Sequence, residues 1–212
     1  MKKNFTELVF ILDKSGSMSG LEGDTIGGFN SLIKKQKGED GDAIVTTVLF
    51  NHMIEVKHDA VDLKKIKAMT TKDYSVSGCT ALLDAVGSSI DSISAKHKKL
   101  GEDTPEKTIF IITTDGMENS SKEYTYDKVK KLISKQKKKG WEFLFLGANI
   151  DVAAEARRFG IDDDKAVKYS CDREGVALNY MCLSDAVSSV RKGKVLNKSW
   201  KQKIEENYES KK

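Results

Sequence analysis

Short apolar runs alternate along the chain with longer segments in which apolar residues recur every three or four positions. Four of the runs are rich in β-branched and aromatic side chains: LVFILD (8–13), AIVTTVLF (43–50), TIFIITTD (108–115) and WEFLFLGA (141–148). Each run is nearly continuous rather than alternating, which is typical of parallel strands covered on both faces. We therefore predict four buried strands.

The segments between the runs have the periodicity of amphipathic helices. Ile26, Phe29 and Ile33 share one helical face, and three later stripes have similar spacing: Leu83, Val86, Ile90 and Ile93; Val129, Leu132 and Ile133; and Val176, Tyr180, Leu183, Val187 and Val190. Strands that alternate with helices form right-handed βαβ units. The pattern predicts an α/β fold, a doubly wound and mostly parallel sheet with helices on both faces.

One pair of strand-like stretches departs from this alternation. In AIVTTVLFNHMIEVKHD (43–59), Asn51 and His52 separate two strand-like runs, which indicates a tight hairpin. The second run is then an antiparallel strand at the edge of the sheet, an ordinary feature of mixed sheets.

Composition favours a single domain. The chain has 212 residues, 39% of them hydrophobic, which is enough for one well-buried core and too few for two comfortable ones. Lys and Arg number 36 against 32 Asp and Glu, so the formal charge is only +4. That balance lacks the basic excess of a dedicated nucleic-acid binder, and we do not expect nucleic acid as a partner.

The cysteines and the N-terminal segment indicate a reduced, cytoplasmic protein. Cys79, Cys171 and Cys182 are odd in number and form no CxxC, so neither a disulfide framework nor a zinc site is predicted. The apolar stretch in MKKNFTELVFIL is too short for a secretory signal. No run approaches the roughly 20 apolar residues of a membrane span, so we expect no membrane association.

The chain changes character near its end. We predict a domain over residues 1–191 and a basic C-terminal tail over 192–212. Leu196, Trp200, Ile204 and Tyr208 are spaced by four and would line one side of an amphipathic helix. Such a helix either folds back on its own domain or binds a partner helix. The histidines His52, His58 and His97 are scattered, and we expect all three at the surface.

Three places in the sequence supply oxygen ligands. Asp13 ends the first predicted strand and is followed by Ser15 and Ser17, while Asp115 ends the third run, and Thr80 stands just before a predicted helix. In an open α/β sheet, ligands bind outside the carboxyl ends of the strands. We therefore expect these five side chains to meet at one edge of the sheet.

Two carboxylates and three hydroxyls form a hard, all-oxygen ligand set. Such a set suits Mg²⁺ or Mn²⁺ rather than zinc, which favours His and Cys. With at most two negative charges from the protein, the ion would keep a position for one more ligand, such as the carboxylate of an Asp or Glu on a partner protein.

These residues carry a family resemblance. Asp13-Lys14-Ser15-Gly16-Ser17 resembles the DxSxS motif of von Willebrand factor A (VWA) domains, GCTALLDA (78–85) resembles their threonine loop, and Asp115 in TTDG resembles their distal aspartate. In that family the three motifs form the metal-ion-dependent adhesion site (MIDAS). The resemblance spans roughly residues 5–190 and implies the VWA fold, metal ligands at Asp13, Ser15, Ser17, Thr80 and Asp115, and an acidic residue of a partner protein as the ligand. FLFLGANIDVAAEARRFGI (143–161) and the small size are similar to stand-alone bacterial or phage members.

Two other functions stay open at this point. The first is a magnesium-dependent phosphoryl-transfer enzyme, since an aspartate at a strand end near magnesium also describes aspartyl-phosphate chemistry. Such enzymes typically have a second acid two residues after the first, where this chain has Ser15. The second is a scaffold with an unused metal site. We expect a binding domain rather than an enzyme, because no histidine or other base accompanies the predicted ligands.

Overall fold

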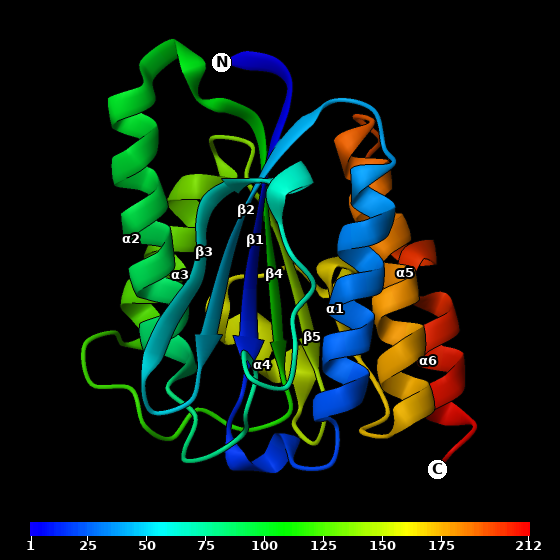
Figure 1. The fold of residues 1–212 in the computed structure, drawn as a ribbon. Coiled ribbons are helices and arrows are strands. Elements are labelled where there is room, and N and C mark those ends of the chain that lie inside the picture. The colour runs from blue at the N-terminus through cyan, green and yellow to red at the C-terminus, as the bar shows by residue number, and fades with distance from the viewer.

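A mixed six-stranded sheet forms the centre of the molecule. The computed structural model describes residues 1–212, and its strand order is β3-β2-β1-β4-β5-β6 (Figure 1). The strands are β1 (Lys2–Asp13), β2 (Asp42–Phe50), β3 (Ile54–Asp62), β4 (Pro105–Thr114), β5 (Glu142–Gly147) and β6 (Ala166–Lys168). Neighbouring strands are parallel except β2 and β3. The predicted fold class, with its antiparallel edge strand, is confirmed.

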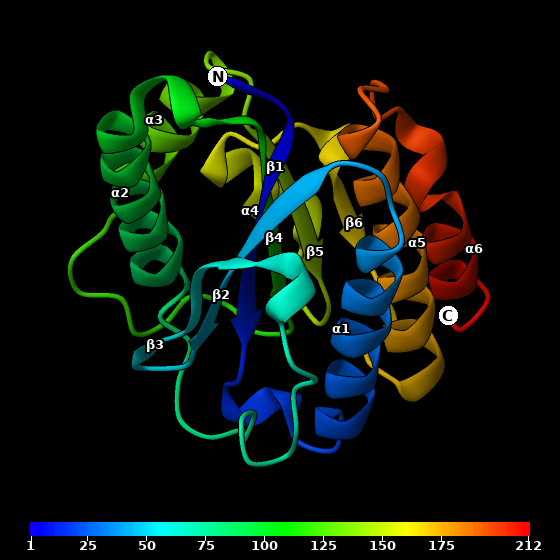
Figure 2. The same ribbon diagram turned by 45° about the horizontal axis from the view of Figure 1, so that its top comes forward.

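Helices cover both faces of this sheet (Figures 1 and 2). One face carries α1 (Glu22–Lys37), α5 (Arg173–Arg191) and α6 (Gln202–Glu209), and the other carries α2 (Leu82–Leu100), α3 (Tyr126–Lys137) and α4 (Val152–Phe159). Successive side chains of a strand point to opposite faces. Leu8 and Phe10 of β1 therefore pack with α1 and α5, whereas Val9 packs with α2. Burial on both sides explains why the strand is apolar without alternation.

Polar residues cap the helices that leave the sheet. Thr125, Asp151 and Asp172 precede α3, α4 and α5, and each accepts a hydrogen bond from a backbone N–H in the first turn of its helix. This N-capping satisfies donors that a helix start leaves free. None of the helices is long and apolar enough to cross a lipid bilayer.

Several local predictions are corrected. The helix α4 and the strand β6 were not predicted, because eight and three residues are too short to establish a periodic pattern. His97 is not a surface residue: its side chain is 11% exposed, and its Nε2 lies 2.7 Å from Oε2 of the buried Glu7.

The C-terminal segment 192–212 folds back against the domain. A short 3₁₀ turn at Lys198–Lys201 precedes α6, so the helix is shorter than the spacing of apolar residues predicted. Leu196, Trp200 and Ile204 are buried in the core beside α5. The Trp200 Nε1–H also donates to the carbonyl oxygen of Asp164 at 2.8 Å. These contacts attach the segment to the sheet edge at β6, while the domain boundary at residue 191 stays a prediction.

Candidate metal centre

The two predicted carboxylates lie at the carboxyl ends of neighbouring parallel strands. Asp13 is the last residue of β1, and Asp115 directly follows β4, with which β1 pairs. The hydroxyl Oγ1 of Thr114 donates to Asp13 Oδ2 at 2.6 Å. The last residue of β4 therefore orients the carboxylate of β1, so that its position depends on the pairing of the two strands.

The loop after β1 directs two hydroxyls toward Asp115. The Ser15 N–H donates to Asp13 Oδ1 at 2.7 Å, which turns the chain immediately after the strand. Ser15 Oγ then lies 3.0 Å from Ser17 Oγ, and Ser17 Oγ donates to Asp115 Oδ1 at 2.6 Å. A row of side-chain oxygens thus connects the ends of the two strands.

Thr80 reaches the same place from the loop before α2. Gly78 has a φ of 73°, in the left-handed region that glycine adopts most readily, and its carbonyl oxygen accepts the Gly16 N–H at 3.0 Å. The Thr80 N–H donates to Asn119 Oδ1 at 2.9 Å, and the Asn119 N–H donates back to the Thr80 carbonyl oxygen at 3.0 Å. The threonine loop is therefore tied to both of the other loops.

The three hydroxyls converge on the backbone of Gly116. A Cβ atom added at this glycine would lie 3.1 Å from Thr80 Oγ1, 3.3 Å from Ser17 Oγ and 4.0 Å from Ser15 Oγ. Three oxygens from two loops of the chain thus lie around one small volume beside Asp115. The absence of a side chain at position 116 keeps that volume free.

The site concentrates negative charge without a positive partner. Asp13 and Asp115 are each 1% exposed, and neither forms an ion pair with Lys, Arg or His. Burial raises the pKa of Asp13, and the charge of Asp115 raises it further; burial also raises the pKa of Asp115. Lys14, although adjacent, turns its Nζ to Glu55 at 2.6 Å. Two buried carboxylates without a neighbouring cationic side chain are costly, and either protonation or a bound cation would relieve that cost.

The donor set decides which cation fits. The structure holds no group of three or more His, Cys, Asp or Glu side chains placed for a metal ion, so any ion held here would take most of its protein ligands from hydroxyls. Neutral hydroxyl and carboxylate oxygens are the ligands of hard divalent ions such as Mg²⁺ and Mn²⁺. The residues present therefore fit a hard divalent cation.

Other acidic residues near the motifs contact backbone N–H groups or an arginine rather than the candidate ligands. Glu118 accepts N–H bonds of 2.8–2.9 Å from the start of α2 and from its own loop. Asp84 accepts three N–H bonds of 2.8–2.9 Å from residues 122–124. Asp24 lies 3.5 Å from Arg173 Nε. Glu118 and Asp84 thus hold the loop after β4 against α2.

Some groups at the site were not predicted. Thr114 and Gly116 flank Asp115 in the sequence, and that proximity was the available signal. The Tyr74 hydroxyl donates to the Asp13 carbonyl oxygen, and Cys171 Sγ lies 3.9 Å from Asp115 Oδ2. No sequence pattern connects these two residues to the strand ends, because they come from distant loops.

Comparison with known proteins identifies the fold. No family model matches the sequence, and no curated protein matches it either. Solved structures do match. Proximal thread matrix protein 1 from the mussel byssus, in a structure with a zinc-occupied MIDAS motif, is 14% identical, with a TM-score of 0.61 over 87% of this chain and 46% of that one. The present chain thus spans about half the length of the mussel protein.

Two further similar structures have the same architecture. Manganese-loaded TRAP protein of Plasmodium vivax is 16% identical, with a TM-score of 0.59 over 82% of this chain and 71% of that one. The VWA domain of SpRpn10 is 9% identical, with a TM-score of 0.57 over 84% of this chain and 94% of that one. At such low identity the likeness concerns the fold alone, and it shows that this chain has the fold of VWA domains.

Proposed function

We propose that this VWA-fold chain is a protein-binding domain that depends on a divalent metal ion. Asp13, Ser15, Ser17, Thr80 and Asp115 would hold Mg²⁺ or Mn²⁺ in a metal-ion-dependent adhesion site. The observation that carries the proposal is the convergence of three hydroxyls on Gly116, beside two buried carboxylates that no cationic side chain compensates.

A bound divalent ion would supply an electrophilic point that accepts a carboxylate oxygen from an Asp or Glu of a partner protein. The chain's own residues make that contact selective. The three hydroxyls add no charge, so the protein contributes at most the two carboxylates of Asp13 and Asp115. In a partly desolvated site, a third carboxylate would be attracted more strongly than in an exposed salt bridge.

The similar structures support the choice of metal chemistry. The mussel protein is described with zinc in its MIDAS motif, and the TRAP protein of Plasmodium vivax with manganese. In this chain, Ser17 Oγ lies 3.0 Å from Ser15 Oγ and 2.6 Å from Asp115 Oδ1, and Thr80 Oγ1 approaches the same point at Gly116, which supports one shared ion. Hard oxygen ligands favour Mg²⁺ or Mn²⁺ over zinc, and Mg²⁺ usually keeps several waters in its coordination shell.

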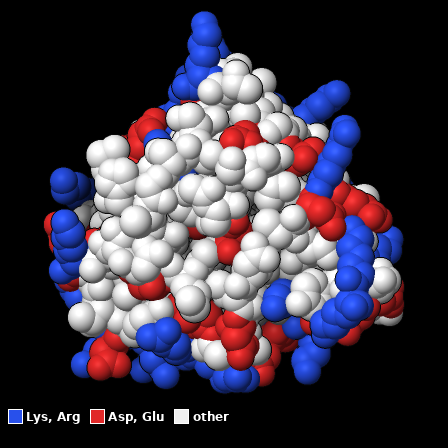
Figure 3. All heavy atoms as spheres, turned by 90° about the horizontal axis from the view of Figure 1, so that it is seen from below, with Lys and Arg blue, Asp and Glu red and all other residues white.

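The surface around the site describes the partner further. Figure 3 looks onto the carboxyl edge of the sheet, where residues other than Lys, Arg, Asp and Glu cover most of the middle, some Asp and Glu atoms show among them, and Lys and Arg side chains stand mostly at the margin. Two exposed methionines belong to the loops on this edge: Met117 lies two residues after Asp115 and is 72% exposed, and Met53 in the β2–β3 hairpin is 61% exposed. Methionine adapts its shape to varied apolar surfaces. We expect a partner loop with one acidic residue flanked by apolar side chains.

The cysteines and the residue at position 15 bear on where the protein acts and on whether it catalyses a reaction. We propose that the protein is cytoplasmic and of bacterial or phage origin; its three free cysteines are consistent with a reducing compartment. We propose binding rather than phosphoryl transfer, because the hydroxyl at position 15 is oriented toward Ser17 and no second acid stands there. Turnover of p-nitrophenyl phosphate with Mg²⁺ would instead support the enzyme.

Calorimetric titration with Mn²⁺ tests the site. Wild type is expected to bind one ion, and Asp13→Ala and Thr80→Ala are expected to lower the affinity at least about tenfold. Asp24→Asn is the matched control, because this nearby carboxylate pairs with Arg173 instead. Unchanged affinity in both site variants would refute the assignment.

A second experiment tests partner binding. Wild type and Asp13→Ala are used as baits in host lysate, with Mg²⁺ plus Mn²⁺ and again with EDTA. Retention of a protein only by wild type and only with metal supports the proposal. A protein retained equally in all four conditions would indicate a scaffold that does not use its metal site.

A further inference from the structure

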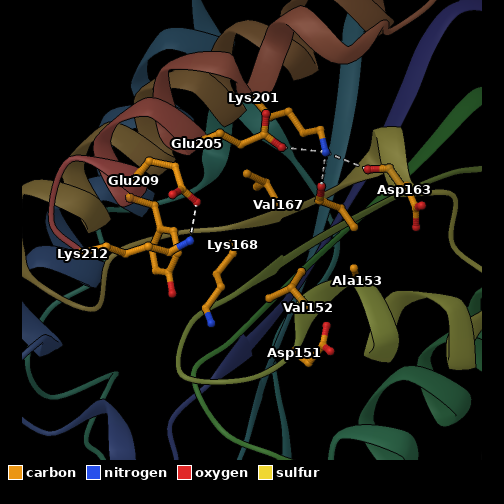
Figure 4. Close-up of a pocket in the computed structure, with 12 residues that line it drawn as sticks. Asp151, Val152, Ala153, Asp163, Val167, Lys168, Lys201, Glu205, Glu209 and Lys212 are labelled. Atoms are coloured by element: carbon orange, nitrogen blue, oxygen red, sulfur yellow. Dashed lines mark hydrogen bonds and ion pairs between the residues drawn. The ribbon is translucent and has the colours of Figure 1, made fainter.

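One edge of the sheet is covered by the C-terminal segment, whereas the other edge is open. At one edge, β6 is only three residues long and the C-terminal segment lies against it. Figure 4 shows Lys201 at that edge; its Nζ donates to the carbonyl oxygens of Asp163 and Ala166 at 2.8 Å and lies 2.9 Å from Glu205 Oε1. A cleft of about 770 Å³ lies beside it, lined by both lysine and acidic side chains. This mixed lining favours neither an anionic nor a cationic ligand.

At the opposite edge, β3 is nine residues long and pairs only with β2. The Asn51 N–H donates to the Met53 carbonyl oxygen at 3.0 Å where the hairpin closes. Hydrogen-bonded pairs alternate along an antiparallel ladder, so Glu55 bonds to β2 while the backbone groups of Ile54 and Val56 point outward. Such a free edge is a template for another strand.

The side chains at this edge also lack cover on one face. Ile54 is 40% exposed and Val56 is 56% exposed. Both border a groove of about 310 Å³ between β3 and α2, which Val48 and Ile93 also line. The side of α2 toward this groove carries Ser88 and Ser92, small residues that allow a second helix to approach closely.

The charges of β3 are complementary to themselves. If two copies of β3 pair antiparallel about a two-fold axis at Val56, Val56 stands opposite Val56 of the second copy, and Glu55 stands opposite Lys57 twice. Opposite residues in such a pair lie on the same face and interact directly. Within each chain Glu55 already pairs with Lys14, and Lys57 with Asp73. The pairing would therefore extend a row of alternating charges on one face while burying valine on the other.

We propose that this protein forms a two-fold dimer in which β3 pairs with β3 of a second copy and the two α2 helices meet over the joined sheet. The register of β3 against β2 shifts between Val56 and His58, so Lys57 lies at a β-bulge and the regular contact ends near that residue. Because the axis reverses the strand direction, the carboxyl edges of the two sheets face opposite ways. A dimer would thus present its two metal centres at opposite ends, so that it could link two partners.

A charge-reversal experiment tests the register. Glu55→Lys and Lys57→Glu each place like charges opposite one another twice, and each is expected to raise the dimer dissociation constant at least about tenfold. An equal mixture of the two variants restores both opposite-charge pairs, but only in a heterodimer centred on Val56. Sedimentation velocity over a range of concentrations should show two weakly associating variants and a dimeric mixture.

Controls keep the outcomes distinct. Lys168→Glu, on the β6 edge, is expected to dimerise like wild type, and circular dichroism of each variant verifies folding. A wild type that stays monomeric at millimolar concentration overturns the proposal. The charges of β3 would then serve to prevent this edge from pairing with another strand. A wild-type dimer that neither reversal weakens, or a mixture that does not recover, overturns this interface. Chelation with EDTA should leave the dimer intact, which separates this result from the metal proposal.

Discussion

Gly116→Ala offers the sharpest perturbation of the proposed site, because it removes no ligand. The added Cβ would lie 3.1 Å from Thr80 Oγ1 and 3.3 Å from Ser17 Oγ, a few tenths of an ångström closer than ordinary contact. Without metal, both hydroxyls can rotate or shift away. With an ion bound they cannot, since their positions are set by coordination. Displacing groups around a metal typically costs 10–100-fold in affinity, so we expect at least about a tenfold loss, or about 1.4 kcal/mol.

Stability should change much less than metal affinity. The φ of Gly116 lies outside the left-handed region, so alanine fits the backbone. A Gly→Ala change at a compatible position stabilises by about 0.4–1 kcal/mol through the unfolded chain. The close contacts offset part of this gain, and the free energy of unfolding without metal should stay within about 1 kcal/mol of wild type.

The assay combines Mn²⁺ titration calorimetry with thermal unfolding in EDTA. Gly27→Ala is the matched control: this glycine lies in α1, and a Cβ there meets no atom within 4 Å. It should raise stability by about 0.5–1 kcal/mol and leave Mn²⁺ affinity unchanged. If Gly116→Ala binds Mn²⁺ as tightly as wild type, the three hydroxyls do not share an ion at this position, and the reasoning is wrong.

Four more outcomes are expected. Mg²⁺ at 100 times its dissociation constant should stabilise wild type by about 2.7 kcal/mol in thermal unfolding, and an unchanged midpoint in EDTA would contradict a bound ion. Asp84→Ala removes the acceptor of three backbone N–H groups and should cost about 2–3 kcal/mol in urea unfolding, with Asp84→Asn losing less. His97→Ala leaves the buried carboxylate of Glu7 with only the 3.3 Å hydrogen bond from Thr46 Oγ1 and should cost about 3 kcal/mol; a loss below about 1 kcal/mol would show that the pair of His97 and Glu7 is weak. Trp200→Ala should cost about 3–5 kcal/mol, because the indole is 9% exposed in the core, and a smaller loss would mean that the C-terminal segment contributes little to the fold.

The sheet could be predicted because its strands carry their own signal. A strand buried on both faces is apolar at nearly every position, as in residues 8–12 and 109–112, whatever its neighbours are. The helix α4 and the strand β6 carry no comparable signal. Their few residues become ordered through contacts with other elements, such as the bonds of Lys201 to the backbone around β6.

His97 shows why the position of a single residue could not be predicted from its local sequence. His97 stands near a helix end in a lysine-rich stretch, which is typical of the surface. Glu7 lies inside the sheet, in β1 opposite Ile44 of β2. Its buried carboxylate contacts the imidazole of His97 in α2, which comes 90 residues later in the chain. No local pattern indicates such a partner.

By itself, the sequence determined the fold class and the chemistry of the candidate ligands: buried strands that end in aspartate, and hydroxyls in glycine-containing loops. Only the tertiary structure decided that these groups meet. The contact between Ser17 and Asp115 joins residues 98 positions apart, and it exists because β1 and β4 are neighbours in the sheet. Two further properties also depend on which residues the fold brings together. No cationic side chain lies beside the two carboxylates, and the edge of the sheet at β3 is open. A local sequence pattern gives the chemical type of each residue and its secondary structure. Burial and pairing depend on contacts with residues that are distant in the sequence.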